Sequence, residues 1–173
     1  LELLKQLGIR PDIIHSHDHH TGLVPLYMRT IYKDYFSRTG SDFTVHNFGY
    51  QGEYPVEWYP EIGLSEEAKP LVIKSGRLNF MVVPPGVIKQ FGQEGKYINT
   101  VSNTYAQDIR HGPFEIDRLY NSLGNRLGGI LNGIDYTVWN PAIDKDVVAN
   151  YDINDGVEEV RRARETNKKA LQN

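Results

Sequence analysis

A run of closely spaced histidines is the feature of this sequence that could do chemistry most directly. Four of the six histidines fall within the segment Asp12-Ile-Ile-His-Ser-His-Asp-His-His20, directly after a short apolar stretch. The spacing suggests a metal site if His15, His17 and His20 converge. Hydrolases with the His-x-His-x-Asp-His pattern, however, carry aspartate where this chain has His19. The alternative is that these histidines have no chemical role and are solvent-exposed side chains beside the cap of the following helix.

Polar residues also follow three further apolar stretches of the chain. They are His46, Asn47 and Gln51 after the second stretch, Ser102 after the third, and Asn132 and Asp135 after the fourth. Together with Asp18 and His20, they would meet at one edge of a parallel sheet, where such sheets bind ligands. Carboxylate, amide and imidazole groups suit the hydroxyls of a sugar. Flat apolar faces for a sugar ring are offered by Tyr50, Trp58, Tyr59, Tyr136 and Trp139.

The elements that must position these residues alternate between apolar runs and helical patterns. Strands are predicted at 12–15, 42–46, 97–102 and 126–131, and helices at 1–7, 21–31, 102–110 and 157–171. The prolines and glycines of 54–95 predict short helices and turns that form a lobe over one face of the sheet. This alternation predicts an α/β fold, with a Rossmann-like parallel sheet and flanking helices.

The composition excludes several classes of protein. The chain has 173 residues, no cysteine and a formal net charge of -3, which argues against disulfides, thiolate zinc sites and a nucleic-acid partner. It carries no apolar run of membrane-spanning length and no signal-peptide pattern, so no membrane partner is expected. The first residue is Leu1 rather than methionine, within a predicted helix. We therefore expect the chain to be a fragment.

Several ordered motifs resemble the bacterial glycogen synthase and plant starch synthase family of glucosyltransferases. They are Pro11-Asp-Ile-Ile-His-Ser-His-Asp-His-His-Thr-Gly-Leu-Val-Pro25, Thr44-Val-His-Asn-Phe-Gly-Tyr-Gln-Gly52, Asn79-Phe80, Thr100-Val-Ser-Asn-Thr-Tyr-Ala106, Gly129-Ile-Leu-Asn-Gly-Ile-Asp-Tyr-Thr-Val-Trp-Asn-Pro141 and Asn167-Lys-Lys-Ala-Leu-Gln172. The resemblance implies a GT-B type enzyme of two Rossmann-like domains. Residues 1–150 would be the later part of the N-terminal, acceptor-side domain, and 151–173 a charged helix leading toward the second domain.

The resemblance also implies an activity and roles for particular residues. Members of the family transfer glucose from ADP-glucose or UDP-glucose to the non-reducing end of an α-1,4-glucan, with retention and without a metal ion or cofactor. By position, Asp18 and His46 match the catalytic aspartate and histidine at the sugar. Substrate-binding residues would be His20, Asn47, Tyr50, Gln51, Asn132 and Asp135. Retention in this fold is usually explained by front-face attack, with the leaving phosphate helping to deprotonate the acceptor.

Some departures from the family pattern limit what is carried over. The glycine-rich Lys-x-Gly-Gly loop and the second domain have no counterpart here, so we expect the chain alone to be inactive, and aggregation-prone or stabilised by self-association. His19 replaces a tryptophan, and Met81 to Lys96 replaces a short Lys-Ala-Gly helix. A non-catalytic glucan-binding or regulatory module and a metal-dependent hydrolase built on His15 to His20 are the alternatives. A cytoplasmic location is expected, with the plastid as the other option.

Overall fold

The computed structural model describes residues 1–92, 98–113 and 115–172 of the chain. It divides into two compact units, Leu1–Leu131 and Asn132–Asn173, which we describe one at a time. The expected domain boundary at residue 150 remains a prediction. In the described ranges, no helix combines the length and apolar character needed to cross a bilayer.

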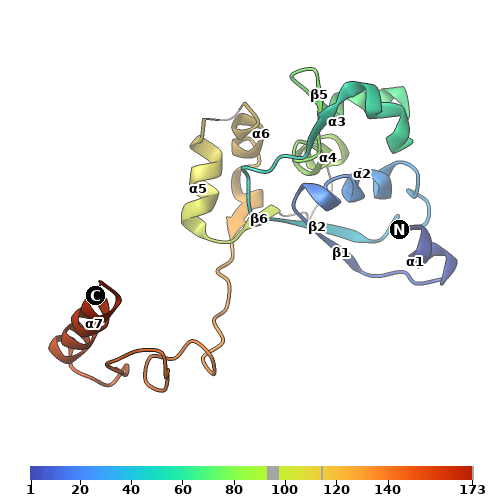
Figure 1. Ribbon diagram of the computed structural model, residues 1–173. Helices are drawn as coiled ribbons and strands as arrows, with labels where there is room; N and C mark the ends of the chain where they lie inside the picture. The colour runs from blue at the N-terminus through green and yellow to red at the C-terminus, as the bar shows by residue number, and fades with distance from the viewer. Residues whose placement is uncertain (93–97, 114, 173) are drawn as a thin grey trace. The chain divides into compact units, whose positions relative to one another are not determined.

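The first unit is built on a parallel sheet of four strands, as the sequence predicts (Figure 1). Its order is β1-β2-β6-β7, with each neighbouring pair parallel. The strands are β1 (Ile13–His17), β2 (Gly40–Val45), β6 (Ile98–Thr100) and β7 (Leu127–Gly129). All four carboxyl ends therefore lie at one edge of the sheet, where the polar residues are expected to meet.

The first strand is longer than the sequence predicts. It continues past His15 to His17, because its pairing with β2 runs from Ile13 opposite Gly40 to His17 opposite Thr44. In this sheet β1 lies at one edge, and alternate side chains of the strand, including both histidines, are exposed. Polar residues can occupy such positions without an energetic penalty, so an apolar pattern does not reveal them. The prediction for 97–102 begins at Tyr97, which lies outside the described residues.

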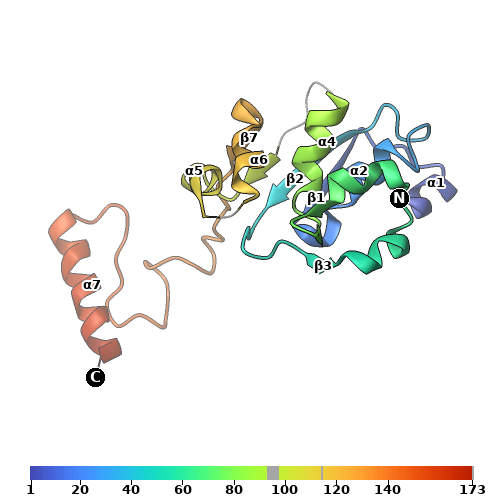
Figure 2. The same ribbon diagram turned by 90° about the horizontal axis from the view of Figure 1, so that it is seen from above.

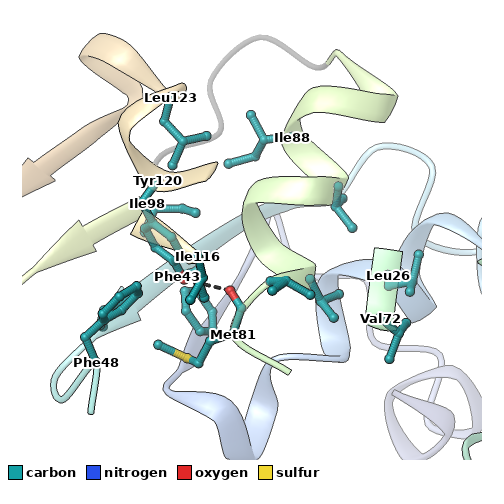
Figure 3. Close-up of a cluster of buried hydrophobic side chains, with 14 of the residues drawn as sticks. Leu26, Phe43, Phe48, Val72, Met81, Ile88, Ile98, Ile116, Tyr120 and Leu123 are labelled. Atoms are coloured by element: carbon teal, nitrogen blue, oxygen red, sulfur yellow. Dashed lines mark hydrogen bonds between the residues drawn. The ribbon is translucent and has the colours of Figure 1, made fainter. Parts of the chain in front are cut away.

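Helices flank the sheet (Figure 2). They are α1 (Glu2–Gln6), η1 (His19–Thr21), α2 (Val24–Arg29), α4 (Val83–Phe91), α5 (Asn103–His111), α6 (Asp117–Asn121) and η4 (Gly124–Arg126). Leu26 of α2 and Ile88 of α4 belong to the same buried cluster as Phe43 of β2 and Ile98 of β6 (Figure 3). The flanking helices of the predicted α/β fold are thus confirmed, whereas α6 was not predicted.

Within the segment predicted as a lobe, residues 53–79 form short helices and a small antiparallel sheet that the sequence does not predict. The elements are β3 (Glu53–Pro55), η2 (Val56–Ile62), η3 (Glu66–Ala68), α3 (Lys69–Val72), β4 (Ile73–Lys74) and β5 (Arg77–Asn79), with the strands in the order β3-β5-β4. Strands β4 and β5 are joined by Ser75 and Gly76, both at positive φ (51° and 76°). This is the turn that suits a tight hairpin. Strands of two or three residues are too short for periodicity to detect.

The second unit contains the helix α7 (Val157–Gln172), at the position where the sequence predicts a charged helix. Arg161 forms ion pairs with Glu158 and Glu165 on this helix, at 3.9 Å and 3.4 Å. Among residues 132–172, Ala163 is the buried apolar side chain, while large apolar residues such as Trp139 and Leu171 are exposed. Packing within this unit alone therefore buries little apolar surface.

Candidate active site

Asp18 directly follows β1 and anchors the loop after β2. One carboxylate oxygen, Oδ1, accepts hydrogen bonds from the backbone N–H groups of His46 (2.8 Å) and Asn47 (3.2 Å). The Asp18 backbone N–H in turn donates to the carbonyl of Thr44 at 3.0 Å. These bonds fix the carboxylate at the carboxyl edge of the sheet, as the topology predicts.

The backbone of Asp18 is strained. Its φ of 52° and ψ of -176° belong to a region that residues other than glycine seldom adopt. Such conformations cost of the order of 1–3 kcal/mol and persist where surrounding contacts hold them. Here the contacts are the hydrogen bonds to the loop after β2, so the strain accompanies the placement of the carboxylate.

His46, the first residue after β2, contacts His17 at the end of β1. The Nδ1 atom of His17 lies 3.0 Å from Nε2 of His46, within hydrogen-bonding distance, and both side chains are exposed. Partial desolvation of the ring is the largest cause that lowers the pKa of His17, followed by the charges of His15 and His46, with Asp18 and Asp42 acting in the opposite direction. The structure thus favours a neutral His17.

The loop after β2 carries three of the predicted binding residues. The side-chain oxygen of Asn47 accepts a hydrogen bond from the Gly49 backbone at 3.0 Å, and Tyr50 is 68% exposed. Gln51 is held from the lobe, because Asn79 donates from Nδ2 to the Gln51 side-chain oxygen at 2.7 Å. Asn79 is buried at the end of β5 and was not among the predicted site residues. The Asn79-Phe80 motif was the signal that pointed to it.

Two glycines bring the lobe and the loops into close contact. A β-carbon at Gly22 would collide with the carbonyl oxygen of Phe80, and one at Gly52 would lie 2.6 Å from the β-carbon of His19. Gly52 also has a φ of 64°, which favours glycine. His19 therefore packs directly against the loop after β2.

A hollow of about 350 Å³ opens beside this contact, lined by His19, Glu53 and the loop residues 49–52. The ring of His20, a predicted binding residue, stacks on His19 with centroids 3.8 Å apart. Tyr50 and Gln51 both line the hollow, which places these two predicted residues around one surface depression. Its size is compatible with a sugar unit.

Tyr120 of α6 packs against Phe48 in the loop after β2 (Figure 3). It is fully buried, donates its hydroxyl to the Met81 carbonyl at 2.8 Å, and packs edge-on against Phe48 with ring centroids 4.8 Å apart. Burial, and to a smaller extent the charge of Asp18, raises the pKa of the Tyr120 hydroxyl. Tyr120 therefore serves as a neutral structural support at ordinary pH.

Ser102, at the end of the third strand, has a local role. Its hydroxyl oxygen accepts the Tyr105 backbone N–H at 2.9 Å and caps α5. The end of β7 packs on the same point, because a β-carbon at Gly129 would collide with the backbone of Ser102. The glycine that opens the 129–141 motif is thus required by close packing.

The remaining predicted residues, Asn132 and Asp135, belong to the second unit. Both are exposed. The Oδ1 atom of Asp135 accepts hydrogen bonds from the Thr137 backbone at 2.9 Å and the Thr137 hydroxyl at 2.6 Å, which lowers the pKa of the carboxyl. The structure therefore brings Asp18, His46 and Asn47 together, and the place of Asn132 and Asp135 beside them remains a prediction.

The histidine run divides into two ring pairs. His15 and His17 stack with centroids 4.2 Å apart, while His19 and His20 form the second pair. Within residues 1–92, 98–113 and 115–172, no three histidine, aspartate or glutamate side chains form a group that could hold a metal ion. The metal-dependent hydrolase hypothesis gains no support from these positions.

Comparisons with known proteins agree with this arrangement. Residues 1–132 match the model of the starch synthase catalytic domain. The chain is 39% identical over 160 residues to the glycogen synthase of Thermotoga maritima, covering 89% of this chain and 32% of that enzyme. It is 42% identical over 173 residues to the glycogen synthase of Rhodopseudomonas palustris, covering 96% and 32% of the two chains.

A solved structure shows the same fold. The catalytic domain of starch synthase IV from Arabidopsis thaliana, bound to ADP and acarbose, superposes with a TM-score of 0.64 at 32% identity. The match covers 98% of this chain and 34% of that one. This chain thus spans about a third of the length of the relatives it matches.

The parallel sheet and these matches define part of an α/β fold of the GT-B type. Within that class, the chain belongs to the starch synthase catalytic domain family. The resemblance read from the sequence motifs is confirmed.

Proposed function

We propose that this chain forms part of a glucan synthase, which transfers glucose from a nucleotide sugar to the non-reducing end of an α-1,4-glucan with retention of configuration. The observation that carries the proposal is the position of the Asp18 carboxylate, held on the backbone amides of His46 and Asn47 at the carboxyl edge of the sheet. A carboxylate beside an imidazole at this edge suits a reaction in which positive charge develops on a sugar.

In this proposal the two catalytic residues act on the transition state. The negative charge of Asp18 stabilises the oxocarbenium-like sugar, and the His46 ring contacts the transferred glucose. Because the hydrogen bonds of Asp18 are already formed in the folded chain, the carboxylate needs no rearrangement as charge develops. No covalent intermediate on the protein is required, in keeping with front-face attack.

ADP-glucose is the donor that we favour over UDP-glucose, because the Arabidopsis starch synthase IV domain is bound to ADP and acarbose. Acarbose in that structure also supports a glucan-like acceptor. The hollow lined by His19, Tyr50 and Gln51 is where we expect part of the acceptor to bind. Asn132 and Asp135 would reach the transferred glucose once the rest of the enzyme is in place.

The test uses a chimera in which this chain replaces the matching third of the Thermotoga maritima glycogen synthase, with transfer of labelled glucose to glycogen as the readout. We expect Asp18→Ala and His46→Ala to lower turnover by about two powers of ten or more, near 3 kcal/mol, with little change in glucan affinity. Asp34→Asn, a change at an exposed residue, is the matched control. Near-normal turnover in both alanine variants would reduce these residues to a structural role and favour a non-catalytic glucan-binding module.

A further inference from the structure

We propose that His17 is a positioning residue for His46: by donating a hydrogen bond from Nδ1, it fixes the ring of His46 and leaves the Nδ1–H of His46 to face the sugar. The inference rests on the proposed function in one respect, since it takes His46 to be the residue at the transferred glucose. His17 was not among the predicted site residues.

The number of ring protons limits how His17 and His46 can share this contact. A neutral imidazole carries one N–H and one bare nitrogen. His17 Nδ1 and His46 Nε2 lie 3.0 Å apart, so one of these two nitrogens holds the proton and the other accepts it. The two rings must therefore share one tautomer: either both carry the proton on Nδ1 or both carry it on Nε2.

The position of Asp18 bears on which of the two tautomers the rings adopt. The Asp18 carboxylate lies 2.8 Å from the backbone nitrogen of His46. In a histidine side chain Nδ1 is bonded to Cγ and lies nearer the backbone than Nε2 does. We therefore infer that the proton of His46 lies on Nδ1, the ring nitrogen nearer the backbone that Asp18 holds, and that Nε2 of His46 is bare and accepts from His17.

Contacts on β1 and β2 hold His17 itself in place. Thr44 donates its hydroxyl proton to Asn99 Oδ1 at 2.8 Å, so Nε2 of His15, which lies 2.7 Å from the same hydroxyl oxygen, must be a donor. His15 is thereby fixed on the sheet, and its ring stacks on His17 with centroids 4.2 Å apart. His17 is held by a ring on one side and a hydrogen bond on the other.

Charge supports the same arrangement. The groups that act on His17 are His15 on its own strand, His46 and Asp18 at the strand ends, and Asp42 on β2. Burial and the two histidines outweigh the two carboxylates, so the pKa of His17 is lowered and the ring stays neutral near pH 7. A neutral His17 can donate one hydrogen bond to His46, whereas two protonated rings could not face each other in this way.

The test is direct observation of the tautomers in the 173-residue chain labelled with ¹⁵N-histidine. Long-range proton–nitrogen correlations distinguish a protonated ring nitrogen from a bare one. We expect Nδ1 to be protonated and Nε2 bare in both His17 and His46. A proton on Nε2 of His46 would overturn the proposal without any reference to enzyme activity.

Variants then test the dependence of His46 on His17. His17→Phe should change the nitrogen signals of His46, and His17→Asn, which places an amide donor near the position of Nδ1, should restore them. His111→Asn, at an exposed position of α5, should leave them unchanged. Unaltered His46 signals in His17→Phe would count against a positioning role.

Activity in the Thermotoga maritima chimera separates this proposal from the proposed function. His17→Phe should lower kcat about ten- to a hundredfold with an unchanged KM for glucan, and His17→Asn should recover much of the loss. Normal turnover of His17→Phe beside an inactive His46→Ala would overturn the positioning role. An active His46→Ala variant would instead overturn the proposed function, while the tautomers observed in the unsubstituted chain would still decide the hydrogen bond between His17 and His46.

Discussion

Two aspartates that follow predicted strands, Asp18 in the first unit and Asp135 in the second, are held in very different ways. Each accepts two hydrogen bonds through Oδ1. The donors to Asp18 are 28 and 29 residues away in sequence, in the loop after the next strand of the sheet, whereas both donors to Asp135 belong to Thr137. The first aspartate is fixed by the tertiary fold and the second by a local turn.

The same contrast runs through the packing of the two units. Large apolar side chains of the first unit, such as Leu26 and Phe43, are buried in a common cluster. In the second unit Tyr136, Trp139 and Leu171 are 70% exposed or more. A site residue in the first unit therefore depends on contacts within this chain, while the position of Asn132 or Asp135 must depend on contacts made elsewhere.

The strongest test of this contrast removes an equivalent side chain from each unit. Leu26→Ala should destabilise the first unit by about 2–5 kcal/mol, because Leu26 is fully buried and its loss leaves a cavity. Leu171→Ala, at a residue 90% exposed, should change stability by less than about 0.5 kcal/mol. Urea unfolding followed by circular dichroism measures both, and equal effects would contradict the contrast.

A pair of tyrosine substitutions sharpens the comparison. Tyr120→Phe removes the donor to the buried Met81 carbonyl and should cost about 1–3 kcal/mol, because that oxygen loses its partner away from water. The control, Tyr136→Phe, alters a ring that is 73% exposed and should shift stability by less than about 0.5 kcal/mol. The comparison fails if the two midpoints in urea move by the same amount.

Substitutions of the two aspartates should have a smaller effect on the free energy of unfolding. Asp18→Ala should destabilise the chain by about 1 kcal/mol, because the amides of His46 and Asn47 lose their acceptor but lie near water. Asp18→Gly should cost less, since glycine adopts a positive φ without strain. Asp135→Ala should leave the unfolding midpoint unchanged. Should Asp18→Gly prove less stable than Asp18→Ala, backbone strain at this position would be refuted.

The smallest effect is a dependence of stability on pH. The pKa of His17 is lowered in the folded chain from its ordinary value of about 6.5. As the pH falls below that value, the unfolded chain binds a proton that the folded chain resists, so the free energy of unfolding decreases until the folded pKa is passed. His17→Phe should remove this part of the decrease between pH 7 and 5, and His111→Asn should retain it. Identical pH slopes for His17→Phe and the unsubstituted chain would contradict the assignment.

The sequence was sufficient for the parallel sheet, because each apolar run is followed by a helical pattern, and parallel strands then bring their polar ends to one edge. The proximity of Asp18 to the loop at His46 follows from that rule. The sequence was not sufficient to predict where β1 ends, because the exposed histidines there carry no apolar signal. The sheet formed by β3, β5 and β4 and the helix α6 were also missed, since each element is at most five residues long.

The supporting contacts of the site could not have been predicted, because they depend on register. His17 lies opposite Thr44, so His46, two residues further on, shares its face of the sheet and comes within reach. A shift of one residue would have turned these histidines to opposite faces. The bond from Asn79 to Gln51 likewise depends on how β5 pairs with β3, which no local pattern specifies.

The contacts of Gly22 with Phe80 and of Gly52 with His19 have a consequence for recombination between relatives. The segments 18–22, 47–53 and 79–81 meet through these contacts and through the bond between Asn79 and Gln51. A larger residue at position 52 has room only if position 19 changes with it, and the segment at 79–81 constrains position 22 in the same way. Loops grafted from a relative at these positions should therefore be exchanged as one set of three segments, because any one of them transplanted alone would pack against neighbours with different side chains.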